Sequence, residues 1–146
     1  MATSNLKSGC GALIFCSKTN RYLFLLRTKH RMANHWGIVG GKIEASETVI
    51  QGLVREIQEE IGQPPEIIKT IPLETFVSND KVFNFHTYLC VVENEFIPIL
   101  SDEHIAWAWC SIDFSPKPLH QGLKNSFSNK IMRTKLQTIF DIIDLI

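Results

Sequence analysis

Three glutamates near the middle of the chain have the spacing of a metal-binding face on a helix. Glu59 and Glu60 follow Glu56 by three and four residues. At about 100° per residue, both fall within about 60° of Glu56 around a helix axis, so the three carboxylates share one face. Like charges at these spacings each destabilise an isolated helix by about 0.2–0.5 kcal/mol. Because a divalent cation with oxygen ligands would remove that repulsion, the spacing predicts a metal-holding helix.

The residues around the glutamates predict where this helix begins, ends and packs. Ser46 is a candidate N-cap, with Glu47 in the first turn, where the helix dipole favours a carboxylate. Gly52 lies on the same arc one turn earlier and leaves room over the acids, although it costs up to about 1 kcal/mol relative to alanine. Gly62 and then Pro64-Pro65 would end the helix. The apolar face expected to pack on a sheet consists of Ile50, Leu53, Val54, Ile57 and Ile61.

Apolar runs outside this helix predict the strands of that sheet. Residues 36–41 form a short strand that enters a turn at Gly40-Gly41, where positive φ would let backbone amides approach a ligand. Residues 105–112 form the last strand. Two hairpins are expected from four runs rich in apolar and β-branched residues, at 9–16, 21–27, 67–78 and 81–93.

The C-terminal region predicts one amphipathic helix that docks on the core. From about Leu123, apolar residues recur at intervals of three to four. The expected docking face consists of Phe127, Ile131, Met132, Leu136, Ile139, Phe140 and Ile143. Because the glutamate helix also needs a sheet to pack on, the order of elements predicts an α/β fold with a mixed sheet between two helices.

Length and composition favour a single soluble domain. The chain has 146 residues, of which 45% are apolar, and its formal net charge of zero argues against a general nucleic-acid binder. No run approaches the roughly 18 apolar residues of a membrane span, and the N-terminus lacks the pattern of a signal peptide. We therefore expect a cytoplasmic protein without a membrane or nucleic-acid partner. Four cysteines without metal-ligand spacing are expected to be buried free thiols: Cys10, Cys16, Cys90 and Cys110.

The stretch at 41–63 resembles the signature of the Nudix (MutT-like) hydrolases. That signature reads Gly-x5-Glu-x7-Arg-Glu-U-x-Glu-Glu-x-Gly-U, where U is a bulky aliphatic residue. The chain departs from it at the last position, where Gln63 replaces the aliphatic residue. The matching residues are Gly41, Glu47, Arg55, Glu56, Ile57, Glu59, Glu60 and Gly62. The resemblance implies that residues 1–146 form one Nudix domain, an α/β/α sandwich with a mixed sheet between the Nudix helix and a C-terminal helix.

The resemblance also implies an activity, a cofactor and partners. A Nudix hydrolase cleaves a nucleoside diphosphate linked to a group X by attack of water on phosphorus, with Mg²⁺ or Mn²⁺ as the cofactor. Three substrate classes remain open. The first is a nucleoside diphosphate derivative such as ADP-ribose, a nucleotide sugar or FAD. The second is a dinucleoside polyphosphate, and the third is an (oxidised) nucleoside triphosphate. A different class of function is a non-catalytic Nudix-fold module that binds nucleotides or a protein. The expected partner is a small nucleotide substrate. Because relatives are often dimers, a second copy of the chain, in a homodimer, is another possible partner.

Family analogy assigns roles to the residues of the motif. Glu56 and Glu60 are the expected metal ligands, Glu59 is a further ligand or the catalytic base, and the Gly41 carbonyl is an additional ligand. Arg55 falls beside Glu59 on the helical wheel.

Two acids outside the metal set complete the expected catalytic residues. Arg55 is expected to orient a carboxylate, with Glu47 as the partner found in relatives. Glu103 lies in the loop before the last strand, where it is either a ligand or base, as in some relatives, or an ordinary polar loop residue.

The expected substrate contacts lie before and within the motif. Lys42 is a phosphate contact, and Gly40 offers a backbone amide. Arg27 begins the basic stretch that continues through Lys29, His30 and Arg31, which is either a solvated loop or a phosphate-contacting edge. His35 and His86 are expected to be satisfied histidines and not catalysts. Five aromatic residues are considered as well: Trp36, Phe76, Phe83, Tyr88 and Trp107. One or two of them can stack on a base, and the others are expected to be core residues.

Overall fold

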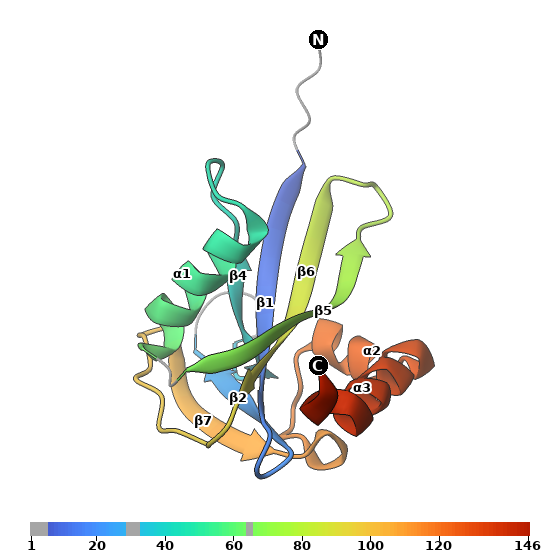
Figure 1. Ribbon diagram of the computed structural model, residues 1–146. Coiled ribbons are helices and arrows are strands. Elements are labelled where there is room, and N and C mark those ends of the chain that lie inside the picture. Colours follow the sequence, from blue (N-terminus) through green and yellow to red (C-terminus); the bar gives the residue numbers. More distant parts are fainter. Residues whose placement is uncertain (1–5, 29–32, 64–65) are drawn as a thin grey trace.

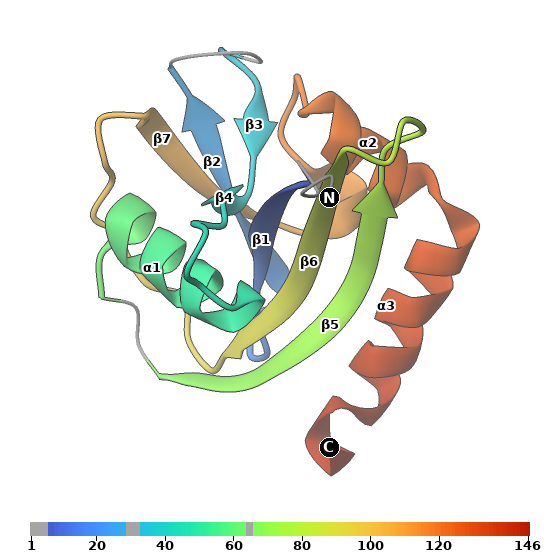
Figure 2. The ribbon, with the colours of Figure 1, turned by 90° about the horizontal axis from the view of Figure 1, so that it is seen from above.

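The computed structural model describes residues 6–28, 33–63 and 66–146. In this part of the chain, one mixed sheet is covered by α1 on one face and by α2 and α3 on the other (Figures 1 and 2). The strands are β1 (Lys7–Cys16), β2 (Arg21–Arg27), β3 (Trp36–Gly37), β4 (Val39–Lys42), β5 (Ile67–Val77), β6 (Phe83–Val92) and β7 (His104–Cys110). The helices are α1 (Val49–Ile61), α2 (Gln121–Ser128) and α3 (Lys130–Ile142), with short 3₁₀ turns at Ile112–Phe114 and Ile143–Leu145. The predicted α/β/α sandwich is confirmed.

Strand β1 is the centre of the sheet. It pairs in parallel with β6 over its whole length and antiparallel with β4 along its first half. It pairs with β2 only near the hairpin turn, at Phe15 and Cys16. Strands β3 and β7 both pair with β2, while β5 pairs with β6 to form the second predicted hairpin. Because β4 lies beside β1, the glycine segment is built into the sheet next to α1.

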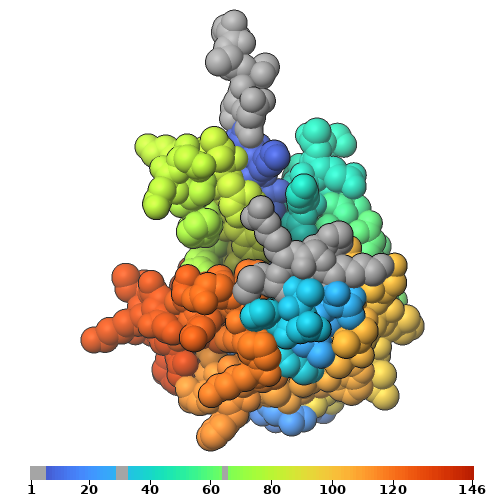
Figure 3. Space-filling view, turned by 180° about the vertical axis from the view of Figure 1, so that it is seen from behind, coloured from blue at the N-terminus to red at the C-terminus, as the bar shows by residue number. Residues whose placement is uncertain are grey.

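The core has two halves, one on each face of the sheet. Alternate residues of β1 point to opposite faces, so Cys10 and Ala12 pack in the half that contains the buried residues of α1, and Leu13 and Phe15 pack in the half that contains those of α2 and α3. Seen from behind, the turn between β5 and β6 lies above α2 and α3 (Figure 3). Buried apolar side chains therefore hold both helical layers on a single sheet.

Helix α1 begins two residues later than predicted. Thr48, and not Ser46, is the N-cap: its hydroxyl accepts from the Gln51 N–H at 3.2 Å, and the Gln51 side chain accepts from the Thr48 N–H at 2.8 Å. This reciprocal capping box satisfies two backbone donors together, which Ser46 does not do. Glu47 therefore precedes the helix. Gly62 ends it with a φ of 77°, as predicted, whereas Pro64-Pro65 lie outside the described residues.

The buried face of α1 differs from the predicted apolar stripe. Ile50 and Val54 are 46% and 49% exposed, so their predicted packing on the sheet is wrong. Glu56, Glu60 and Gly52 are buried instead. The helix is thus turned so that two of its carboxylates, and not two of its aliphatic side chains, face the sheet. Three members of the predicted stripe are buried as expected: Leu53, Ile57 and Ile61.

The C-terminal region forms two helices where one was predicted. Asn129 separates them with an extended backbone, and its side chain caps α3 by accepting from the Met132 N–H at 3.1 Å. Ile131 is exposed and not docked, so its predicted packing is wrong. Phe140 is partly exposed but contacts the core through the edge of its ring, whose centroid lies 6.4 Å from that of Phe15. Four members of the predicted face are buried, namely Phe127, Met132, Leu136 and Ile139, and Ile143 packs against them while partly exposed. The predicted last strand also ends early, at Cys110, and Ile112 begins a 3₁₀ turn.

Two expectations from composition can be compared with the structure. The four cysteines are free thiols, of which Cys110 is half-buried and the others are buried. No helix in the described part of the chain is both long and apolar enough to span a lipid bilayer.

Candidate active site

Strand β4 places two glycines where no side chain fits. Gly40 and Gly41 pair with Gly11 and Cys10 of β1 in a regular strand. The predicted turn with positive φ is wrong, because Gly62 is the only glycine of the described residues with a positive φ. A Cβ at Gly40 would lie 2.5 Å from the Cys10 carbonyl oxygen, and a Cβ at Gly41 would clash with the Glu56 carboxylate. The glycines therefore let a carboxylate of α1 lie directly on β4.

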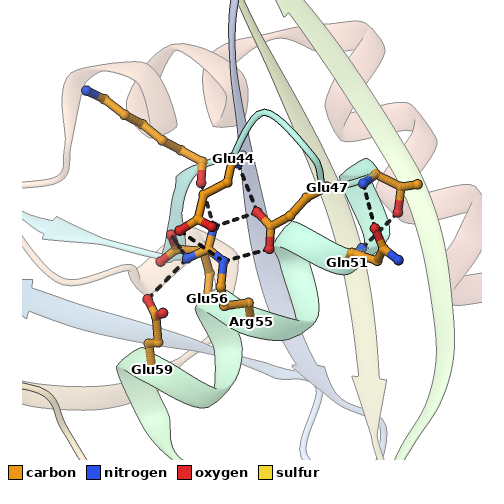
Figure 4. Close-up of polar contacts among 8 residues, drawn as sticks. Glu44, Glu47, Gln51, Arg55, Glu56 and Glu59 are labelled. Atoms are coloured by element: carbon orange, nitrogen blue, oxygen red, sulfur yellow. Dashed lines mark hydrogen bonds and ion pairs between the residues drawn. The ribbon is translucent and has the colours of Figure 1, made fainter.

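Arg55 connects three glutamates and the end of β4 (Figure 4). Its Nε and Nη2 atoms donate to the Glu47 carboxylate at 2.7 and 2.9 Å. Its Nη1 atom donates to Glu56 at 3.0 Å and to Glu59 at 3.2 Å, and Nη2 also donates to the Lys42 carbonyl at 2.8 Å. One planar guanidinium thus sets the direction of three carboxylates, as its fixed fork of donors permits.

Glu47 is the fixed partner of this guanidinium. The hydrogen bond from Arg55 holds the pKa of Glu47 below its usual value, and a hydrogen bond from the Glu44 N–H adds to the effect. That second bond joins the Glu44 nitrogen to Glu47 Oε1 at 2.9 Å. The carboxylate is therefore ionised and anchored at both ends, so Glu47 positions Arg55 from the segment that precedes α1.

Glu56 and Glu60 form a buried carboxylate pair beneath α1. Their side chains are only 12% and 5% exposed. Burial raises the pKa of both, and that of Glu60 rises to about 9, although the Gly40 N–H donates to its carboxylate at 3.2 Å. The neighbouring charges of Glu56 and Glu103 raise the pKa of Glu60 further. Without another cation, such a pair shares a proton at neutral pH.

The three glutamates offer the oxygen ligands that a hard divalent cation prefers, although their carboxylates do not point to a common position in this structure. The Glu59 side chain is 57% exposed and bonded to Arg55. As arranged, no three His, Cys, Asp or Glu side chains among the described residues could hold a metal ion. The donors nevertheless fit, because the buried Glu56 and Glu60 oxygens have raised pKa values and a cation can replace their shared proton.

A comparison with known proteins identifies the family of this chain. A family model described as the NUDIX domain matches residues 6–129. The chain belongs to the Nudix family. Members of this hydrolase family act on pyrophosphate bonds, so the predicted enzyme class is confirmed.

This Nudix hydrolase is similar to several named enzymes and to proteins of known structure. The chain is 32% identical over 114 residues to the dihydroneopterin triphosphate diphosphatase of Haemophilus influenzae, covering 68% of this chain and 70% of that protein. It is 44% identical over 50 residues to the 8-oxo-dGTP diphosphatase of Proteus vulgaris, covering 34% of this chain and 45% of that protein. Its fold is similar to that of a MutT Nudix hydrolase from Burkholderia pseudomallei, with a TM-score of 0.70, 28% identity and coverage of 85% and 97%.

The end of the loop before β7 and the first residue of β7 bring two more side chains to the carboxylate pair. Glu103 is exposed, and its charge raises the pKa of Glu60, so the two acids are neighbours. His104, which the sequence reasoning missed, is buried with Nε2 at 3.8 Å from Glu60 Oε2. Burial and then the charge of Arg27 lower the pKa of His104, and its Nδ1 has no hydrogen-bond partner among the described residues. Its place beside Glu103 was the only signal in the sequence.

The residues predicted to contact substrate lie in different surroundings. Lys42 is exposed at the end of β4. The Gly40 N–H donates to Glu60 and thus supports a carboxylate. Trp36 packs in the core half of α2 and α3, away from the buried acids. Arg27 ends β2 opposite His104. The remaining basic residues of that predicted stretch, Lys29, His30 and Arg31, lie outside the described residues.

A separate pocket lies between β5, β6 and α3. Its volume is about 250 Å³. Tyr88, one of the five candidate base-stacking aromatics, lines it, but none of the predicted catalytic or metal-binding residues does. Its charged side chains are Glu74 and Lys135. Both are committed to internal contacts, since Glu74 accepts from the Ser126 hydroxyl and Lys135 donates to the Leu73 carbonyl at 2.6 Å. The predicted catalytic and metal-binding residues lie instead on or beside α1, β4 and the start of β7.

Proposed function

We propose that this Nudix hydrolase, as a single domain over residues 1–146, cleaves the triphosphate chain of a nucleotide or a related heterocyclic triphosphate. The products are a monophosphate and diphosphate. The observation that carries the proposal is the buried Glu56–Glu60 pair, held against Gly41 and ordered by Arg55. Triphosphates are favoured over other diphosphate derivatives because the curated relatives are named for dihydroneopterin triphosphate, 8-oxo-dGTP and CTP.

The chain would hold Mg²⁺ or Mn²⁺ through oxygen atoms alone. Glu56, Glu60 and the Gly41 carbonyl are the proposed ligands, and Glu59 is the fourth. When bound, the cation neutralises phosphate oxygens and lowers the pKa of a water molecule. Because Glu56 and Glu60 are buried, water would screen their attraction to a bound cation less than it does at an exposed site.

The protein must also position the carboxylates and accept a proton from the attacking water. Arg55 and Glu47 act as positioning residues, because the guanidinium holds Glu56 and Glu59 while Glu47 holds the guanidinium. Proton acceptance falls to Glu103 or Glu59, which are the two exposed acids near the buried pair.

Substrate contacts are assigned to the rim of this site. Lys42 reaches the phosphates as an exposed ammonium at the end of β4. Gly40 contributes indirectly, through its bond to Glu60. Arg27 supplies a guanidinium beside His104. Trp36 packs in the core half of α2 and α3, so its proposed role is to support the Arg27 side of the site and not to stack on a base at the carboxylates.

A substrate panel with and without Mg²⁺ tests the proposal. The panel contains CTP, 8-oxo-dGTP, dihydroneopterin triphosphate, ADP-ribose, FAD and a dinucleoside polyphosphate, and the assay measures released phosphate or diphosphate. We expect metal-dependent turnover of at least one triphosphate. Glu56→Gln and Glu60→Gln should each lower kcat by at least about 100-fold, because each removes a charged ligand. Glu93→Gln, on an exposed acid paired with Lys18, is the matched control and should leave kcat unchanged.

Two outcomes would count against this proposal. Normal turnover by the Glu56 and Glu60 variants would show that the buried pair does not hold the metal. Tight nucleotide binding without hydrolysis of any panel member would identify a non-catalytic Nudix module. Glu59→Gln and Glu103→Gln, assayed in parallel, separate the two candidate bases, because only loss of the true base should remove the acidic limb of the pH–rate profile.

A further inference from the structure

Arg27 and two histidines form a cluster that reaches the carboxylate pair through His104. Arg27 is the Cα partner of His104 across β2 and β7. On its other side, a Cβ placed on Gly37 would lie 3.8 Å from Arg27 Cδ and 3.9 Å from His120 Cβ. Gly37 therefore leaves an open position between Arg27 and His120. The pKa values of His104 and His120 are both lowered, first by burial and second by the charge of Arg27. At His120, the charge of His35 adds to this effect.

Arg27 differs from the other arginines that the structure describes. Arg21 forms a two-pronged pair with Glu95, Arg133 pairs with Asp113, and Arg55 binds its glutamates. The Arg27 guanidinium forms no hydrogen bond and no ion pair with any residue of 6–28, 33–63 or 66–146. Arg27 is a half-buried residue paired across the strands with His104, and no described residue supplies its guanidinium with a counter-charge in contact. Such a guanidinium is expected to bind an anion, and its fork of donors matches a phosphate.

His120 adds a second donor in a fixed orientation. Its backbone N–H donates to the Trp36 carbonyl at 2.7 Å, which ties it to β3. Its ring Nδ1 accepts from the Gly122 N–H at 3.1 Å and caps α2. Because Nδ1 is an acceptor in a neutral ring, the proton of that ring is on Nε2, which is then a donor. The capping bond thus sets the tautomer that an anion near Arg27 requires.

The position of this cluster relative to the buried acids indicates which anion it binds. His104 lies between the two, with its ring 3.8 Å from Glu60 and its backbone paired with Arg27. A phosphate chain bound at Glu56 and Glu60 can therefore continue past His104 to Arg27. The backbone at Arg27 is held in place, since its N–H donates to the His35 carbonyl at 3.1 Å and its carbonyl accepts from the Asn34 N–H at 2.8 Å. The backbone that carries the guanidinium is thus fixed.

We propose that Arg27 and His120 bind the terminal phosphate of the triphosphate, which departs within the diphosphate product. This inference rests on the proposed function and extends it, because it names the feature that distinguishes substrates. A free terminal phosphate carries more charge and more acceptor oxygens than the esterified phosphate of a diphosphate linked to a sugar or a second nucleoside. The chain therefore selects triphosphates through a contact remote from the bond that breaks.

Kinetics on a matched nucleotide pair test this selection. We would measure kcat/KM for one nucleoside as its triphosphate and as its diphosphate, in the wild type, Arg27→Gln, Arg27→Lys and His120→Asn. Arg27→Gln should lower kcat/KM by about 10- to 100-fold for the triphosphate and less than about threefold for the diphosphate. Arg27→Lys should recover part of the loss, because it restores charge without the fork. His120→Asn keeps a side chain that can cap α2, and should lower the triphosphate value by about tenfold.

Arg21→Gln is the matched control for these variants. Arg21 lies at the other end of β2 and is paired with Glu95, so its loss should change neither kcat/KM value. Equal losses by Arg27→Gln for the two nucleotides would overturn the inference, because they would indicate a general defect of the site. Unchanged kinetics with the triphosphate would overturn it as well.

A binding measurement separates this inference from the proposed function. Inorganic pyrophosphate binding in Mg²⁺, measured by calorimetry, needs no turnover. Arg27→Gln should weaken its Kd by about tenfold, and Arg21→Gln should leave it unchanged. Equal Kd values for the wild type and Arg27→Gln would overturn the inference. If the wild type hydrolyses no panel member but shows the Arg27-dependent affinity, the proposed function fails while the anion site stands.

Discussion

At the scale of single residues, Arg55 decides how the acidic helix presents its charges. Glu56 and Glu59 both accept from Nη1, and Glu47 takes the opposite edge of the guanidinium. Spacing on a helix predicts a shared face, but it does not predict that one acid is buried while its neighbour is exposed. That difference arises because α1 rests on β4, where Gly41 has no side chain to separate Glu56 from the sheet. The carboxylates differ in chemistry because they differ in burial.

Alanine at each glycine of β4 should separate catalysis from stability. In Gly41→Ala, the new Cβ meets the end of the Glu56 side chain, which can move. We expect turnover to fall by at least about tenfold while the free energy of unfolding changes by less than about 1 kcal/mol. In Gly40→Ala, the new Cβ meets the Cys10 carbonyl oxygen at 2.5 Å. Because backbone cannot move aside, that variant should lose about 1–3 kcal/mol of stability.

Urea denaturation and a turnover assay with Mg²⁺ measure the two effects. The glycine variants serve as controls for each other, since they are adjacent in one strand and differ in what the added methyl group meets. A Gly41→Ala variant with full activity would show that Glu56 does not need to lie against β4.

At the scale of elements, the start of α1 sets the position of Glu47. The capping box between Thr48 and Gln51 begins the helix two residues after Ser46, so Glu47 belongs to the preceding segment and can face Arg55. The signal was present in the sequence, because Thr-x-x-Gln is the pattern of a capping box. Ser46 is equally acceptable as an N-cap by residue type alone. The residue three positions after the N-cap decides between them, because a capping box requires Glu or Gln there.

Removal of the N-cap should destabilise the protein without a direct effect on the acids. Thr48→Ala loses the hydroxyl that accepts from the Gln51 N–H, and we expect a cost of about 1 kcal/mol in the free energy of unfolding. Ser46→Ala is the matched control and should stay within about 0.5 kcal/mol of the wild type. Chemical denaturation monitored by circular dichroism measures both. A larger cost for Ser46→Ala than for Thr48→Ala would place the N-cap at Ser46 after all.

At the scale of the whole molecule, the buried acids make stability depend on pH and on metal. Burial raises the pKa of Glu60 from 4.5 to about 9, so the folded protein keeps a proton that the unfolded chain releases above pH 4.5. The unfolded state then binds fewer protons, and stability falls as pH rises from about 5 to about 9, by at most about 1.4 kcal/mol per pH unit. A divalent cation bound to the ionised pair should reverse this loss.

Thermal unfolding with EDTA or with Mg²⁺ across this pH range measures the effect. We expect Tm without metal to fall between pH 6 and pH 9, and Mg²⁺ to raise Tm more at pH 9 than at pH 6. At 100 times its Kd, a cation stabilises the folded state by about 2.7 kcal/mol. Glu60→Gln should flatten the metal-free profile, because the amide does not titrate. A Tm at pH 9 that does not respond to Mg²⁺ would contradict metal binding at this pair.

The sequence by itself determined the family, the sandwich of helices around a mixed sheet, and the acids that could bind a metal. Those features depend on local spacing, such as three or four residues along a helix or alternation along a strand. Tertiary structure alone decided that Glu56 and Glu60 are buried while Glu59 is exposed, that Ile50 and Val54 face solvent, and that Arg27 lies near His120. These depend on which strand lies under a helix and which loop lies beside a strand, and contacts between residues far apart in the chain have no local pattern.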